Sequence, residues 1–238
     1  MASSIIVNTA DAAELRLVHY LGDHDATSGF VQACESSVRE GDASSLIRTV
    51  ISYPPAIKKI MADKEEGSGA FSLLAALMDR LPNHDEVHEF TRVLVNMVED
   101  AESDVDIKVN LLCNLYNLRE GKDKSWILGR ILNAYIQSSD EEAVLNLLPE
   151  RKSTIGELLQ GNNLERFLIE LQNEDKSVSF NDEKRQLFGI ASELAGKLSR
   201  VCSGNNMDKE AANADSTQQR FLLKMLGTYD EVRMSFDV

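Results

Sequence analysis

The sequence predicts an all-α protein built from antiparallel helical hairpins, and three observations support this fold class. Apolar residues recur along most of the chain with the 3.6-residue period of an α-helix. Polar residues that cap helices precede many of these segments, and glycines follow several of them. Proline occurs only 4 times and aromatic residues make up 6% of the chain. This composition favours helices, because sheets are rich in aromatic and β-branched residues.

In the first half of the chain, the expected helices begin at capping residues and end near glycine or proline. Asp11 with Glu14 and Asn83 with Glu86 have capping-box spacing, in which the first side chain accepts a bond from an early helix amide. The charged, glycine-rich segment 64–69 predicts a flexible loop between two helices. The predicted helices of this half cover residues 10–21, 28–40, 42–52, 55–65, 69–81, 84–101 and 104–119.

In the second half, the longest apolar stripe runs over four helical turns from Leu187 to Val201. Thr154 with Glu157 provides a third capping-box spacing. The small, polar residues 205–214 predict a second loop. The predicted helices of this half cover residues 123–138, 140–148, 154–160, 162–173, 181–203 and 215–227.

Helix pairs are expected to start near residues 104, 140, 181 and 215, and this interval is the size of a helical-hairpin repeat. The interval predicts an irregular α-solenoid of the HEAT or TPR kind, with a compact bundle as the alternative. The predicted divisions are N-terminal helices over 1–66, a helical-repeat arm over 67–228, and a frayed or truncated tail over 229–238.

Composition excludes several classes of function. The chain has 25 basic and 39 acidic residues, for a net charge of −14, which disfavours direct nucleic-acid binding. Its 3 cysteines, Cys34, Cys113 and Cys202, lie far apart and match neither a disulfide framework nor a metal site. The N-terminus lacks a secretory signal, and no apolar run approaches the length of a membrane helix. We therefore expect a cytoplasmic protein that binds no membrane and no cofactor.

One pair of histidines has metal-like spacing. His84 and His88 are four residues apart, so a helix would place both on one face. In the zinc-protease pattern a glutamate follows the first histidine, whereas this chain has Asp85 there, and no third ligand is indicated. We therefore predict a solvated helix turn and no catalytic or metal site; a hydrolase using this pair is the alternative. His19 is expected to be partly buried, and His24 to lie in a polar loop.

Four further features are expected to be structural. Cys113 lies in an apolar segment and is interpreted as a small buried hydrophobe. Trp126 is interpreted as a core residue, with an anchor for a partner as the alternative. The Lys58–Lys59 pair is expected on a solvated face. The Gly67–Gly69 segment is too short for a phosphate-binding loop, because no Gly-Lys-Ser/Thr follows it.

Three segments taken together resemble a known family. They are Ala12–Arg16 (AAELR), Val109–Tyr116 (VNLLCNLY) and Phe221–Tyr229 (FLLKMLGTY). In order and separation they are similar to the N-terminal helical half of the subunit M family of eukaryotic translation initiation factor 3. That family belongs to the PCI class, shared by the proteasome lid and the signalosome. The resemblance covers most of the chain and is weak between about residues 25 and 80.

The resemblance implies a non-catalytic scaffold. Its partners would be other initiation factor 3 subunits and, indirectly, the small ribosomal subunit, to which messenger RNA and initiator transfer RNA are recruited. Family members carry a winged-helix module after the helical arm, and no such segment is recognised after Gly227. We therefore expect a truncated form or a free-standing arm. An adaptor of another PCI-type complex, such as the signalosome, is the alternative.

Overall fold

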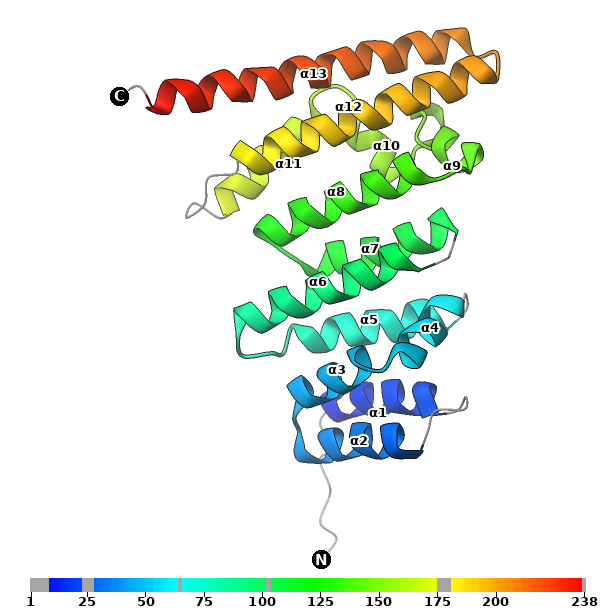
Figure 1. The fold of residues 1–238 in the computed structure, drawn as a ribbon, viewed down its shortest axis with the longest axis vertical. Helices are drawn as coiled ribbons and strands as arrows, with labels where there is room; N and C mark the ends of the chain where they lie inside the picture. The colour runs from blue at the N-terminus through cyan, green and yellow to red at the C-terminus, as the bar shows by residue number, and fades with distance from the viewer. Residues whose placement is uncertain (1–8, 23–27, 64–65, 102–103, 175–180, 237–238) are drawn as a thin grey trace, which may run out of the picture. The chain divides into compact units, whose positions relative to one another are not determined.

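The structure is a computed structural model that describes residues 9–22, 28–63, 66–101, 104–174 and 181–236. Within these ranges it contains thirteen α-helices, one short 3-10 helix and no strand (Figure 1). The predicted all-α class is therefore confirmed. Every helix in the same ranges is too short or too polar to span a lipid bilayer. The chain divides into two compact units, residues 1–118 and 119–238.

The first unit is organised around one central helix. Its helices are α1 (Thr9–Gly22), α2 (Ser28–Glu40), α3 (Ala43–Ile51), α4 (Pro54–Ala62), α5 (Gly67–Met78), α6 (His84–Asp100) and α7 (Val105–Leu118). Helix α5 contacts α1, α3, α4, α6 and α7. It is apolar on several sides, which suits a helix packed between neighbours, and its Phe71, Leu74 and Met78 are buried. Leu112 of α7 is also fully buried.

The start of α5 differs from the sequence prediction. Residues 67–69 were expected in a loop, but they form the first turn of α5, and α4 ends at Ala62 rather than at 65. Gly67 is buried here, and a Cβ atom added to it would lie 2.1 Å from the carbonyl oxygen of Ile60. The glycine therefore permits α5 to begin against the last turns of α4. Lys64 and Glu65 lie outside the described residues.

The predicted cap of α6 is present in part. The Asn83 side chain accepts a hydrogen bond from the backbone N–H of Asp85, at 3.0 Å. Glu86 was expected to bond back to the start of its own helix. Its carboxylate instead accepts a bond from the hydroxyl of Ser44 at 3.2 Å, which links α6 to α3.

The other two capping boxes were wrong in position. Asp11 lies inside α1, which begins at Thr9, so it does not precede the helix. Helix α10 begins at Thr154, and its cap is Ser153, whose hydroxyl accepts a bond from the backbone N–H of Gly156 at 2.9 Å. Ser and Thr are both good caps, so spacing alone did not distinguish the two neighbours.

The second unit is organised around a long helix, α12. Its elements are α8 (Gly121–Gln137), α9 (Glu141–Leu145), η1 (Pro149–Arg151), α10 (Thr154–Leu158), α11 (Asn163–Glu174), α12 (Asn181–Gly204) and α13 (Asp208–Phe236). Helix α12 contacts α8, α9 and α13, and Leu194 on it is fully buried. The α8 end is tied to α12 because the Lys197 ammonium donates to three backbone carbonyls there, those of Tyr135 (2.9 Å), Ile136 (2.6 Å) and Ser138.

Helices α12 and α13 run side by side (Figure 1). Small residues of α12 allow close approach: a Cβ atom on Gly189 would lie 3.3 Å from the sulfur of Met225. The Ser192 hydroxyl donates to the carbonyl oxygen of Gln218 at 3.3 Å. Buried apolar side chains complete this packing, with the rings of Phe188 and Phe221 stacked 6.1 Å apart.

Helix α13 begins seven residues earlier than predicted, at Asp208 instead of 215. The predicted loop over 205–214 is therefore wrong for most of its length. Ala211 and Ala214 are both buried. Alanine has the highest helix propensity and leaves room for close packing, so the small residues that suggested a loop instead form a helix face.

Candidate protein-interaction surface

Five large apolar residues are clearly exposed among the described residues: Leu15, Ile169, Leu222, Leu223 and Leu226. Three of the five lie within one and a half turns of α13, with exposed fractions of 39% for Leu222, 69% for Leu223 and 55% for Leu226. Residues three and four apart are neighbours on a helix surface. Leu222, Leu223 and Leu226 therefore form one apolar area, here named the α13 leucine face.

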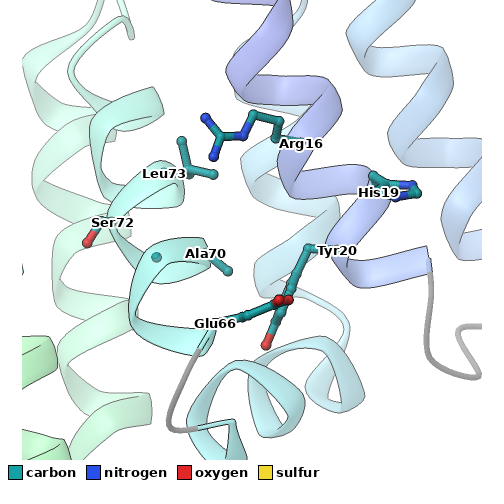
Figure 2. Close-up of a pocket in the computed structure, with 8 residues that line it drawn as sticks. Arg16, His19, Tyr20, Glu66, Ala70, Ser72 and Leu73 are labelled. Carbon is teal, nitrogen blue, oxygen red and sulfur yellow. The ribbon is translucent and has the colours of Figure 1, made fainter.

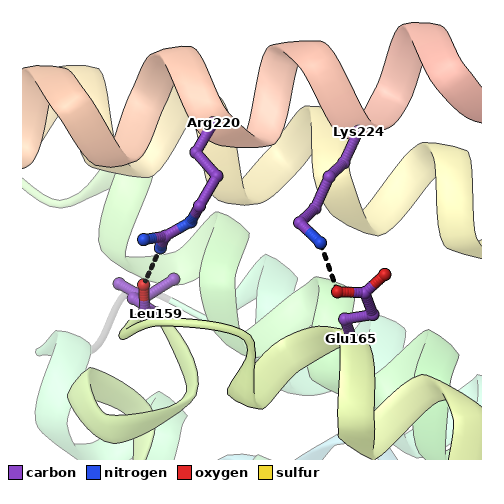
Figure 3. A network of polar contacts seen from close by, with 4 residues as sticks. All are labelled: Leu159, Glu165, Arg220 and Lys224. Carbon is purple, nitrogen blue, oxygen red and sulfur yellow. Dashed lines mark hydrogen bonds and ion pairs between the residues drawn. The ribbon is translucent and has the colours of Figure 1, made fainter.

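The opposite side of α13 is fixed to the rest of its unit. Phe221 is buried, with 1% of its surface exposed. Arg220 donates from Nη2 to the carbonyl oxygen of Leu159 at 2.8 Å, and Lys224 forms an ion pair with Glu165 (Figure 3). Because these side chains fix the rotation of the helix about its axis, the leucines are held outward.

The first unit contains an open depression of about 680 Å³ between α1 and α5 (Figure 2). It is lined by Arg16, His19, Tyr20, Glu66, Gly69, Ala70, Ser72 and Leu73. In Figure 2 Arg16 extends toward Leu73, while His19 and Ser72 lie at opposite ends of the view. The depression therefore does not bring a hydroxyl nucleophile and a histidine base within hydrogen-bonding reach, as a catalytic pair requires.

Tyr20 in this depression is part of a structural network. Its hydroxyl donates to the Asp63 carboxylate at 3.2 Å. The Lys59 ammonium lies 4.1 Å from the centre of the Tyr20 ring and donates to its backbone carbonyl. Burial, with a further contribution from Asp63, raises the pKa of the Tyr20 hydroxyl. The tyrosine therefore stays protonated and ties the end of α1 to the end of α4.

The histidine pair lies at the start of α6, as predicted. His84 and His88 are both exposed on the first turns of the helix. Among the residues that the structure describes, no group of three or more His, Cys, Asp or Glu side chains is placed to hold a metal ion. The pair is thus brought together by its helix without the third ligand that a zinc site needs.

The three cysteines are free thiols in environments that disfavour the thiolate. Burial raises the pKa of Cys34 to about 11, with a smaller contribution from Glu35. Burial also raises the pKa values of Cys113 and Cys202. Because the thiolate is the nucleophile, none of these thiols is activated for attack. Cys113, which was predicted to be a small buried hydrophobe, is half-buried.

Several other predictions require correction. His19 is exposed, whereas it was expected to be partly buried. Trp126 is half-buried, and the Arg130 guanidinium lies 5.1 Å from its ring centre, so it is not simply a core residue. Lys58 is solvated as predicted, but Lys59 is half-buried against Tyr20. His24 lies outside the described residues.

The α13 leucine face was missed by sequence reasoning. Its residues lie in the segment FLLKML, which is apolar on both sides of a helix, so periodicity did not separate the buried Phe221 from the exposed Leu223. Arg220 and Lys224 lie within two residues of the nearest leucine, but only the folded chain shows that both point inward and leave the leucines outside. Comparison of the chain with protein-family models, curated proteins and solved structures finds no match.

Proposed function

We propose that this chain is a non-catalytic scaffold subunit of the translation initiation factor 3 complex. In this role it supports recruitment of messenger RNA and initiator transfer RNA to the small ribosomal subunit through protein–protein contacts. The assignment to this complex is supported by the three segments that resemble the subunit M family. The net charge of −14 favours contacts with proteins over direct contacts with RNA.

The observation that carries the protein-binding part of the proposal is the α13 leucine face. Exposed apolar side chains that lie singly need no explanation, but a group of them marks an interaction site. Leu222, Leu223 and Leu226 form such a group on a helix whose other side is fixed by Arg220 and Lys224. A helix that is held by its inner side and presents leucines outward is suited to bind a partner protein.

The finer architecture that we propose is an irregular α-solenoid of antiparallel hairpins, in which each pair of helices buries its apolar side on the next. Contacts between α5 and α7 in the first unit, and of α12 with α8 and with α13 in the second, support this arrangement. Three unpaired cysteines support a reducing compartment, and we place the protein in the cytoplasm.

The test is affinity purification of the tagged full chain from nuclease-treated cell extract, followed by mass spectrometry. The proposal predicts recovery of initiation factor 3 subunits after nuclease, because the contacts are between proteins. Recovery of signalosome subunits would instead support the adaptor alternative. Recovery of neither set would contradict membership of a PCI-type complex.

A further inference from the structure

The nearest described charge on the outward side of α13 beside the leucine face is acidic. Arg220 and Lys224, the basic residues closest in sequence to the leucines, both point inward, where they bond Leu159 and Glu165 (Figure 3). Asp215 is exposed seven residues before Leu222, so it lies on the same side of the helix. On α13 itself, the outward side next to the leucines therefore carries the Asp215 carboxylate, while the two nearest cations of this helix point inward.

Exposed charges further along α13 do not reverse this sign. Asp208, seven residues before Asp215, is also exposed and lies on the same side of the helix. Lys209 is the one exposed cation on this side among the described side chains of α13. The complete chain is strongly acidic, with 39 acidic against 25 basic residues. Both the local and the overall charge favour a basic partner.

A second copy of this chain is a poor occupant for the same reasons. Two copies would each bring a net charge of −14, and like charges oppose association. Three partly exposed leucines also supply far less than the roughly 800 Å² that each partner buries in a stable interface. The leucines are better suited to anchor a segment that gains the rest of its affinity from opposite charge.

We propose that the α13 leucine face docks an amphipathic helix of a partner protein, with an apolar seam flanked by lysine and arginine. Leu226 lies four residues after Leu222 and three after Leu223, so the three side chains are neighbours on the helix surface and can pack against the apolar seam of a second helix. The basic flanks of the partner then lie near Asp215 and Asp208. This inference rests on the proposed scaffold function, because it specifies the chemistry of one partner.

The experiment uses the full chain and two synthetic helical peptides as probes. Both peptides carry the same leucine seam, and they differ only in lysine or glutamate at the flanking positions. We expect the lysine-flanked peptide to bind in fluorescence anisotropy, and to bind more weakly as salt rises from about 50 to about 300 mM. The glutamate-flanked peptide should bind at least about tenfold more weakly. Equal binding of the two peptides would overturn the charge assignment.

Variants of the chain locate the binding. Leu223→Glu should weaken binding of the lysine-flanked peptide by about tenfold or more, because the apolar seam would cover a charge. Ile169→Glu is the matched control, because Ile169 is 48% exposed in the same unit but lies on α11. Leu223→Ala, which adds no charge, should give a smaller loss in the same direction. Equal affinity of Leu223→Glu and Ile169→Glu would show that the α13 leucine face is not the site.

The same variants separate this inference from the proposed function. If the wild-type chain and Leu223→Glu recover initiation factor 3 subunits equally from cell extract, the scaffold function stands and the docking inference fails. If the wild-type chain recovers none but binds the lysine-flanked peptide through Leu223, the docking inference stands and membership of the complex fails.

Discussion

Substitution of Gly67 by alanine tests the packing of α5 against α4 at a single atom. The added Cβ would lie 2.1 Å from the carbonyl oxygen of Ile60, and 3.3 Å from the Cβ of Asp63. The closest of these atoms is backbone, so it cannot rotate out of the way. Relief of the contact requires α4 and α5 to separate, which loosens the central helix of the first unit.

The expected magnitude follows from two opposing contributions. Overpacking a well-packed site costs about 1–3 kcal/mol. Alanine restricts the unfolded chain and recovers about 0.4–1 kcal/mol of that cost. We therefore expect Gly67→Ala to lower the free energy of unfolding by about 1.3 kcal/mol, and by at most about 2.6 kcal/mol.

Gly69 provides a matched control two residues further along the same helix. A Cβ atom added there has no other heavy atom within 4 Å, and Gly69 is exposed. Because only the unfolded chain is affected, Gly69→Ala should raise the free energy of unfolding by about 0.4–1 kcal/mol. The two variants have the same chemistry and differ only in the space around the new methyl group.

Urea unfolding followed by far-ultraviolet circular dichroism measures both free energies. Hydrogen exchange of the α5 amides would show whether the loss is local, because a loosened α5 exchanges faster than it does in Gly69→Ala. If Gly67→Ala were as stable as Gly69→Ala, the close approach of α5 to the end of α4 would be wrong.

Four further predictions concern other parts of the chain. Leu194→Asp should melt the second unit at a markedly lower temperature, because a buried unpaired carboxylate is costly; an unchanged melt would refute the core assignment. Lys197→Met should destabilise the second unit by about 1–3 kcal/mol, because three carbonyls at the end of α8 lose a charged donor. Thermal melts of Lys197→Met and of the exposed control Lys209→Met would measure this loss of stability. Because the pKa of Cys34 is about 11, its thiol should react with iodoacetamide at about pH 8 far more slowly in the folded chain than in urea, and equal rates would show that it is accessible. Changing both His84 and His88 to alanine should leave partner recovery and zinc content unchanged, and stoichiometric zinc in the wild-type chain alone would revive the hydrolase alternative.

Helix existence was predictable from this sequence because the apolar period repeats over several turns. The segment from Leu187 to Val201 lies in α12, and Leu194 is buried as its position in the stripe predicts. Helix ends were less predictable where two capping residues are adjacent, as at Ser153 and Thr154. At such places the identity of the capping residue depends on which hydroxyl the folded backbone brings close to an amide of the first helical turn.

The remaining errors arise from tertiary contacts. Glycine at position 67 and small residues near Ala211 are typical of loops, yet each allows a helix to pack closely on another. Exposure of Leu223 could not be predicted for a related reason. A helix that is apolar on both sides does not reveal which side is covered, because covering depends on inward side chains such as Arg220.

Direct binding of the purified chain to purified initiation factor 3 tests the scaffold assignment most simply. The two would be mixed after nuclease treatment and separated by size-exclusion chromatography with light scattering. We expect the chain to elute with the complex, and Leu223→Glu to elute with it less completely. Elution of the wild-type chain entirely apart from the complex would contradict the assignment.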